Sequence, residues 1–382
     1  MSKGLFTVLS LPRYSLIGLT VLLGACASST AITEQPSNTT LPIPQKTHQQ
    51  GSSAWKVENT ALSANQNSFV KQVAQRYQIP ENFIQQQLNQ AQVNDRVITL
   101  VSPKRIASIK RHWQTYRNRF VEPIRIRKGT AFWDTHRQTL AAAEKQYGVP
   151  AAIITAIIGV ETIYGQNTGS FKLLDALYTL GFYHPDKTRP ERSQMFRNQL
   201  AALIALAYEG KLDIHTATGS FAGAYGLGQF MPISILHYGV DADKDGKVDL
   251  KNSPKDAIFS VANFLVQHGW QANMPVFPPV QLPPSPASLV SGGLEPTFTW
   301  QALQQKGASS QSKNASWQKG KQLGVIDLKD EVRGNHEYRV ATQNFFTITK
   351  YNRSYFYAAS VADLATALAN QQIRNGYQVT RP

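Results

Sequence analysis

A strongly apolar segment near the middle of the chain places the tightest limit on its fold. Residues 151–164 read AAIITAIIGVETIY, in which apolar side chains recur at helical spacing: Ile153, Ile154, Ile157 and Ile158. A helix with such a face must pack against other elements, because its isoleucines would otherwise stay in water. At 382 residues the chain is long enough to build the core that this helix needs.

The same segment ends on a carboxylate. Glu161 lies four residues beyond Ile157 and eight beyond Ile153, so it continues the buried stripe, and Gly165 is the expected helix stop. Burial and the negative end of the helix dipole both disfavour the charged carboxylate, so we expect a raised pKa for Glu161. A carboxyl group still protonated near neutral pH is the acid that a glycosidic leaving oxygen requires. The alternative is a glutamate that pairs with an arginine or reaches water from the helix end.

Composition narrows the class of protein. The chain is 42% hydrophobic and carries 39 Lys plus Arg against 24 Asp plus Glu, a net charge of +15. These values exclude a miniprotein and a wholly disordered chain, and no run reaches the roughly 20 apolar residues of a membrane-spanning helix. The length predicts two or three structural units. Positive charge favours a polyanionic partner, such as nucleic acid, an anionic wall polymer or lipid head groups, with a solvated surface as the alternative.

The single cysteine, Cys26, follows a segment typical of a signal peptide. Lys3 and Arg13 precede a mostly apolar stretch over 14–25, and one cysteine permits no intrachain disulfide. Leu23-Gly24-Ala25-Cys26 resembles the bacterial lipobox, which implies cleavage before Cys26 and an acylated N-terminus. Ala27 in place of Asp favours the outer membrane. Ordinary secretory cleavage near Ala25 is the alternative, and export of either kind argues against nucleic acid.

The rest of the chain is expected to be mainly helical. Polar residues dominate from Ala27 to about position 66, which predicts a flexible tether. Helices are expected near 69–77 and 83–91, then over 104–121, 130–147, 173–183, 194–209 and 352–370. Many Pro and Gly residues over 274–298 argue against helices there, and short strands are expected at 323–327, 337–341 and 345–350.

A glycine-rich segment over 218–232 offers a second element of a site. It reads TGSFAGAYGLGQFMP, and four glycines within ten positions let a ligand approach the backbone closely. Ser220 and Gln229 carry hydroxyl and amide groups suited to sugars, and the neighbouring aromatic side chains suit sugar rings. A tight turn between helices is the alternative.

A third motif is typical of a cation site. Residues 241–249 read DADKDGKVD, the D-x-D-x-D-G pattern of a calcium loop. The pattern predicts ligation by the side chains of Asp241, Asp243 and Asp245 and by the backbone carbonyl of Lys247. Asn252 replaces the usual glutamate at the twelfth position. We expect a structural Ca²⁺ or Na⁺ rather than a catalytic ion, with an acidic turn that binds no ion as the alternative.

These motifs together resemble one family. Residues 159–165 (GVETIYG), the segment 219–232, His268-Gly269-Trp270 and the run 349–352 are similar to the membrane-bound lytic murein transglycosylase B family. The similarity runs from about Phe69 to the C-terminus. It implies a mainly α (α+β) fold: a lysozyme-like helical core with an N-terminal helical subdomain and a small antiparallel β subdomain.

The resemblance, with the patterns above, divides the chain into six parts. These are a signal peptide (1–25), a lipidated N-terminus and linker (26–66), an N-terminal helical subdomain (67–150), a catalytic core (151–273) with a cation loop (241–256), a β subdomain (274–345) and a C-terminal segment that returns to the core (346–382).

The resemblance also implies roles for individual residues. Glu161 matches the single catalytic acid and base, and Ser220 matches a serine held against it. Arg192 matches one of two arginines that contact the wall peptide; Glu191 stands at the other place, with Arg189 nearby. Asp256 matches a late ligand of a longer cation loop. Sugar-contacting residues are implied at Tyr116, Ser220, Gln229, Tyr351, Asn352 and Tyr357.

The implied reaction cleaves the β-1,4 bond between N-acetylmuramic acid and N-acetylglucosamine in peptidoglycan. With one acid in the motif, the nucleophile is expected to be the acetamido group of the substrate, and its 6-hydroxyl then closes a 1,6-anhydro ring. No cofactor is needed for this chemistry. The alternatives are a hydrolytic muramidase and a non-catalytic wall-binding lipoprotein. The expected partners are glycan strands and a lipid anchor in the outer membrane facing the periplasm, with wall-synthesis proteins left open and nucleic acid excluded.

Overall fold

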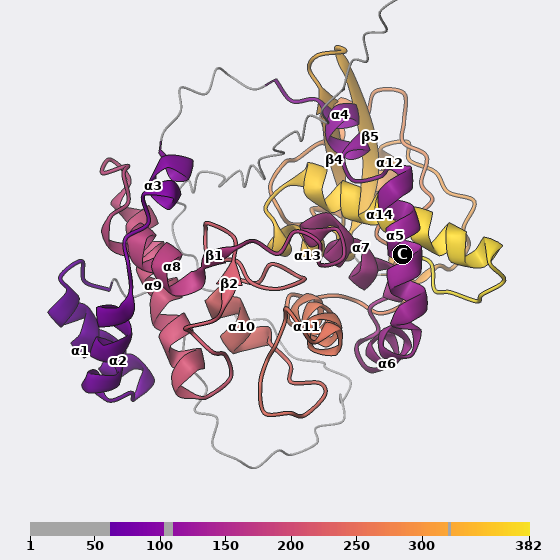
Figure 1. Ribbon diagram of the computed structural model, residues 1–382. Helices are drawn as coiled ribbons and strands as arrows, with labels where there is room; N and C mark the ends of the chain where they lie inside the picture. The colour runs from indigo at the N-terminus through magenta and orange to yellow at the C-terminus, as the bar shows by residue number, and fades with distance from the viewer. Residues whose placement is uncertain (1–61, 103–109, 320–321) are drawn as a thin grey trace, which may run out of the picture. The chain divides into compact units, whose positions relative to one another are not determined.

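The computed structural model describes residues 62–102, 110–319 and 322–382 (Figure 1). The chain divides into two units, Met1–Ser52 and Ser53–Pro382, and every described residue belongs to the second. These residues form 14 α-helices, a two-stranded and a three-stranded antiparallel sheet, which confirms the expected fold class. None of the helices described is long and apolar enough to cross a bilayer. The expected signal peptide, Cys26 and most of the tether lie outside the described residues.

Five helices pack together around the N-terminal end of the described chain (Figure 1). The first turns inward on Phe69, Val70 and Val73, all buried as their spacing predicts. α3 packs on α8, α2 packs on α9, and α8 and α9 pack on each other. Their bounds are α1 Gln66–Tyr77, α2 Glu81–Gln90, α3 Asp95–Val101, α8 Leu173–Phe182 and α9 Pro190–Tyr208.

The prediction of one helix over 104–121 is wrong in its length. Within its described part only α4 (Trp113–Asn118) is helical, because His112 forms an antiparallel bridge with Asp330 instead. The helix expected over 130–147 is in fact two helices, α5 (Pro123–Thr135) and α6 (Arg137–Tyr147). α5 starts early because the Glu122 carboxylate accepts the N–H groups of Ile124 and Arg125, which caps the helix.

The apolar segment forms α7 (Ala151–Thr162), and 11 of its 12 residues are buried. It contacts helices from four parts of the chain: α5, α6, α11 (Pro254–Gln267) and α14 (Tyr355–Arg374). The helix is therefore buried on all sides rather than on one stripe. It stops before Gly165, because Ile163 and Tyr164 already have left-handed φ angles of 54° and 58°.

A β hairpin separates two hydrophobic cores. β4 (Gln322–Asp330) pairs with β5 (Asn335–Thr342) and with β3 (Phe298–Thr299). Side chains on alternate positions of a strand face opposite ways. Leu323 and Val325 accordingly join a small cluster with Trp300 and Trp317, whereas Ile326 and Leu328 join the main core. The same cluster includes residues of η1 (Pro286–Leu289), α12 (Trp300–Gln305) and η2 (Ser316–Gln318).

The strand expected at 345–350 is wrong. The segment forms α13 (Gln343–Tyr351), capped by the Thr342 hydroxyl, which accepts the Asn344 N–H. Its aromatic and β-branched residues are typical of a strand, but all of positions 345–349 are buried. A helix that is buried all round shows no polar face, so periodicity could not distinguish it from a buried strand.

Candidate active site

Glu161 is the one residue of α7 that is not buried. It lies in the last turn, half-buried, and its Oε1 accepts a hydrogen bond of 2.6 Å from the Tyr357 hydroxyl on α14. The protein packed around the carboxyl group raises the pKa of Glu161 to about 7, and the Tyr357 hydrogen bond opposes this rise because it favours the charged form. At neutral pH the group can therefore both give and take a proton.

Three tyrosines surround this carboxyl group. Tyr351 and Tyr357 lie with parallel rings 6.4 Å apart, and Tyr116 on α4 packs against Phe356 at 5.5 Å. Burial raises the pKa of all three hydroxyls, and the nearby charge of Glu161 raises each further, to about 12 for Tyr116. The tyrosines therefore stay neutral and can act as hydrogen-bond donors around the acid.

The glycine-rich segment is fastened directly to this group. β2 (Thr218–Gly219) begins it, pairing with β1 (Phe171–Lys172), and α10 (Pro232–Tyr238) ends it. Thr162, next to the acid, donates its hydroxyl to the Leu227 carbonyl at 2.9 Å, and Tyr351 donates to the Gly228 carbonyl at 2.5 Å. A Cβ at Gly228 would lie 2.8 Å from the Tyr351 oxygen, so the close approach requires glycine.

Gln229 is held in a fixed orientation beside this contact. Its φ angle is 52°, and its side-chain amide donates to the carbonyls of Gly226 at 2.8 Å and Thr168 at 3.3 Å. A left-handed φ angle is uncommon for a residue other than glycine, and the two hydrogen bonds direct the side chain toward the loop after α7.

Ser220 and Asn352 lie in turns at the edges of this group. The Ser220 hydroxyl accepts the Ala224 N–H at 3.0 Å, and the Asn352 carbonyl accepts the Ser354 N–H at 2.7 Å. Within the described chain neither side chain makes a hydrogen bond to Glu161, so the expected contact between Ser220 and the acid is not formed in this structure.

Arg192 lies in the first turn of α9. Its charge helps lower the pKa of His184, after burial, and of Asp186, after the Thr188 hydrogen bond. No hydrogen bond or ion pair among the described residues connects Arg192 with Glu161 or the tyrosines. Arg189 pairs with Glu191 at 3.5 Å, so the acidic replacement engages one of the neighbouring arginines.

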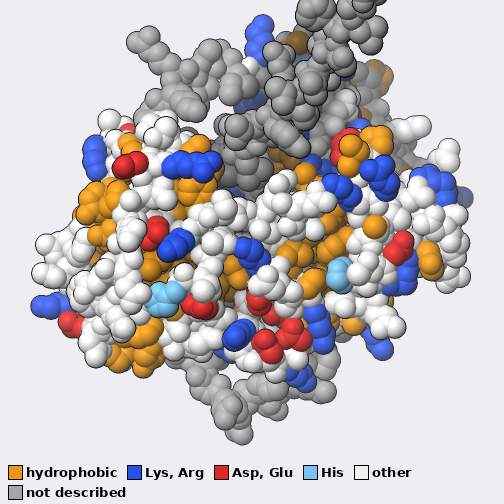
Figure 2. Space-filling view, in the orientation of Figure 1, with side chains coloured by type: hydrophobic (Ala, Val, Ile, Leu, Met, Phe, Trp, Pro, Cys, Tyr) orange, Lys and Arg blue, Asp and Glu red, His pale blue; other side chains and the backbone are white. Residues whose placement is uncertain are grey.

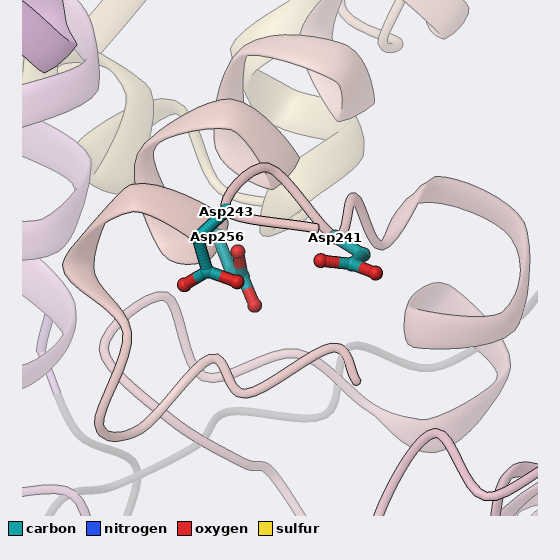
Figure 3. A group of neighbouring side chains, drawn as sticks. All are labelled: Asp241, Asp243 and Asp256. Carbon is teal, nitrogen blue, oxygen red and sulfur yellow. The ribbon is translucent and has the colours of Figure 1, made fainter. Parts of the chain in front are cut away.

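The cation motif brings three carboxylates together (Figure 3). One oxygen each of Asp241, Asp243 and Asp256 lies within 4.8 Å of the others. Asp256 is fully buried in the first turn of α11, where burial and then the charge of Asp243 raise its pKa. Crowded carboxylate oxygens of this kind fit a hard cation such as Ca²⁺.

Two expected ligands are outside this group. Asp245 is exposed and its carboxylate accepts the Lys247 N–H at 2.8 Å, which turns the side chain onto its own loop. Asp245 and Lys247 therefore contribute to the turn, whereas the late Asp256 takes the inner position. Acidic side chains gather over this loop, between α10 and α11, on the face shown in Figure 2.

Comparison with known proteins identifies the family. A family model described as "Transglycosylase SLT domain" matches residues 61–366. The chain belongs to this family. It is 32% identical over 378 residues to "Membrane-bound lytic murein transglycosylase B" of Escherichia coli (strain K12), covering 95% of this chain and 99% of that protein.

Solved structures agree with this family. The soluble lytic transglycosylase SltB1 of Pseudomonas aeruginosa has a TM-score of 0.69 and 36% identity, covering 80% of this chain and 98% of that one. The Escherichia coli lytic transglycosylase Slt35, solved in complex with calcium, has a TM-score of 0.67 and 32% identity, covering 80% of this chain and 93% of that one. The protein is accordingly a lytic transglycosylase.

Sequence reasoning missed three residues of this transglycosylase site. Thr162 connects the acid to the glycine-rich segment, and its place directly after Glu161 was the available signal. The Phe356 ring packs against Tyr116. The basic segment 123–129 contains one buried arginine, Arg125. A charged run is usually a solvated face, so nothing in the pattern distinguishes Arg125 from its neighbours.

The raised pKa predicts how stability changes with pH. Because the Glu161 pKa is about 7 in the folded protein and about 4.5 unfolded, the folded state binds the proton more tightly, and stability falls as pH rises from about 4.5 through 7. Glu161→Gln removes this titration. We expect the variant to gain about 2 kcal/mol over the wild type at pH 8 and nothing at pH 4, allowing for the part of the side chain open to solvent.

Urea unfolding at both pH values measures this difference. The exposed Glu209→Gln serves as the matched control and should show no such pH-dependent gain. Equal stability of Glu161→Gln and wild type at pH 8 would contradict the raised pKa.

Proposed function

We propose that the protein cleaves the β-1,4 bond between N-acetylmuramic acid and N-acetylglucosamine in peptidoglycan and leaves a 1,6-anhydro end. The observation that carries this proposal is the single carboxyl group among three neutral tyrosines. In the part of the chain described, Glu161 is the only carboxylate whose charge acts on Tyr116, Tyr351 and Tyr357. A glycosidase with two working carboxylates would need a second one here.

In the first step Glu161 acts as the general acid. With a pKa of about 7, a large fraction of the group is protonated at neutral pH and can donate its proton to the bridging oxygen as the glycosidic bond breaks. The carboxylate that remains is stabilised by the Tyr357 hydroxyl, which already donates to Oε1.

The nucleophile comes from the substrate. The acetamido oxygen of N-acetylmuramic acid forms a bond to the anomeric carbon as the leaving oxygen departs, which gives a cyclic oxazolinium intermediate. The 6-hydroxyl then attacks the same carbon, its proton goes to Glu161, and the ring opens to restore the acetamide. No water is consumed, so the product is one water lighter than a hydrolysis product.

Other residues of the site would hold the sugar. Tyr351 uses its proton on the Gly228 carbonyl, which leaves its oxygen lone pairs to accept the N–H of the acetamide, with Asn352 beside it. We also assign sugar contacts to Tyr116, Ser220, Gln229 and Tyr357. For Arg192 we propose a contact with the acidic stem peptide.

Digestion of purified peptidoglycan tests the reaction. Glu161→Gln keeps the shape of the side chain but has no proton to donate, so we expect cleavage to fall by at least about a thousandfold while binding to the sacculus persists. The wild type should release products whose mass corresponds to anhydro ends.

Glu209→Gln, on an exposed helix end, is the control and should cleave like the wild type. Anhydro products from Glu161→Gln would disprove the assignment of the acid. Reducing ends from the wild type would favour a hydrolytic muramidase, and wild-type protein that only binds would favour a wall-binding lipoprotein.

We also propose that Asp241, Asp243 and Asp256 bind a structural Ca²⁺. The calcium complex of Slt35 supports this assignment. Because the ion binds only the folded state, millimolar Ca²⁺ should raise the melting temperature by about 5 °C. Asp256→Asn should abolish the shift, whereas Asp245→Asn, outside the cluster, should retain most of it. No shift in the wild type, or equal shifts in the two variants, would contradict the site.

Finally, we propose that Cys26 carries lipid that anchors the protein to the outer membrane, facing the periplasm. The lipobox-like sequence supports this, and the similar Escherichia coli protein is named membrane-bound. Cells grown with labelled palmitate should label the wild type and not Cys26→Ser, which should appear in the soluble periplasmic fraction. Labelling of both, or of neither, would contradict the anchor.

A further inference from the structure

A buried arginine on α5 contacts the end of the helix that carries the acid. Arg125 is only 8% exposed. Its guanidinium donates to the Gly159 carbonyl at 2.8 Å, with a longer contact of 3.5 Å to the Val160 carbonyl. These two carbonyls immediately precede Glu161 in the chain, so a positive charge lies at the last turn of α7.

α5 also holds the chain directly after the acid. Ile163, Tyr164 and Gly165 all have left-handed φ angles, of 54°, 58° and 90°, and this turn folds the Tyr164 ring back between α5 and α7. The fit is close: a Cβ at Gly129 of α5 or Gly159 of α7 would lie 2.2 Å or 2.4 Å from the Tyr164 oxygen. Helix α5 therefore contacts the chain both before Glu161, at Gly159, and after it, at Tyr164.

The contact places a positive charge at a helix end. The last carbonyls of a helix lack partners within it, and together they carry the negative end of the helix dipole. The Gly159 carbonyl already accepts the Ile163 N–H at 3.1 Å, so Arg125 adds a second hydrogen bond there and opposes the negative potential of the helix end where the acid lies. Its nearest carboxylate, Glu122, is 3.9 Å away and 29% exposed, so the guanidinium is not neutralised by a close ion pair. Burial without such a pair lowers the pKa of Arg125 itself, which indicates that the position is not a favourable one for a cation in its own right.

We propose that Arg125 is a positioning residue for Glu161: it holds the last turn of α7 in place and supplies the positive charge that faces this turn. The role rests on the proposed function, because it matters to catalysis only if Glu161 is the acid. The alternative is that Arg125 merely fills the space between α5 and α7, where it would affect stability and nothing else.

Arg125→Gln tests the proposal against Arg127→Gln. Arg127 lies two residues along the same helix, is exposed, and makes no ion pair or hydrogen bond among the described residues. The two variants therefore remove the same charge, one from a buried position and one from an exposed position. At a temperature where both are folded by circular dichroism, we measure kcat, KM and the pH profile of kcat/KM on purified glycan strands.

The proposal predicts that kcat of Arg125→Gln falls about tenfold or more while KM changes less than about twofold, since the acid is displaced but the sugar contacts remain. The alkaline limb of kcat/KM, where Glu161 loses its proton, should move to higher pH by about half a unit, because a neighbouring positive charge is gone. Arg125→Lys keeps the charge and should return the limb to its wild-type position. Arg127→Gln should match the wild type in kcat, in KM and in the pH profile of kcat/KM.

The proposal would be overturned if Arg125→Gln had a lower melting temperature but the same kcat and the same alkaline limb of kcat/KM as Arg127→Gln. If Arg125→Gln does not fold, Arg125→Lys decides: a kcat at least threefold below wild type supports the role, and wild-type kcat overturns it. Glu161→Gln is assayed alongside. Activity in that variant would refute the proposed function, whereas an inactive Glu161→Gln beside a normal Arg125→Gln would refute only this inference.

Discussion

The burial of 11 of the 12 residues of α7 is the constraint on which the rest of the structure depends. A helix of this apolar character is stable in water only if other helices cover every side of it, and here α5, α6, α11 and α14 do so. The one residue that escapes this cover is Glu161. The carboxyl group is therefore carried by a helix whose other residues are all buried, and its proton affinity follows from the surroundings that such a helix requires.

Long-range contacts then bring the remaining groups to this point. The hydrogen bond between Tyr357 and Glu161 joins residues 196 positions apart, and the contact of Tyr351 with Gly228 spans 123 positions. The tyrosines come from three helices: Tyr116 from α4 beside the β hairpin, Tyr351 from the end of α13, and Tyr357 from α14. The site is assembled by the tertiary fold, so local sequence alone cannot specify its geometry.

The difference between contacts within one segment and contacts between distant segments decides what the sequence could predict. The apolar helix and its acid could be inferred from the spacing of isoleucines along one segment, and the raised pKa followed because so apolar a helix has to be buried by other elements. The helix at 343–351 was mistaken for a strand because burial on every side removes the periodic signal, and neither the start of α5 at Pro123 nor the break at His136 was predicted. The resemblance implied the three tyrosines and Asp256. In the structure the tyrosines lie near Glu161, and Asp256 lies with Asp241 and Asp243, whereas the exposed Asp245 lies outside this group. Arg125 could not be foreseen, since only packing distinguishes it from the exposed arginine two positions later.

The direction of the Tyr357 hydrogen bond has a stereochemical consequence. Tyr357 engages Oε1 of Glu161, whereas Oε2 has no hydrogen-bond partner among the described residues. The two oxygens of one carboxyl group are thereby made inequivalent before any sugar arrives. Proton exchange with a bound molecule would therefore use the free oxygen, Oε2, while the phenol holds the other in place.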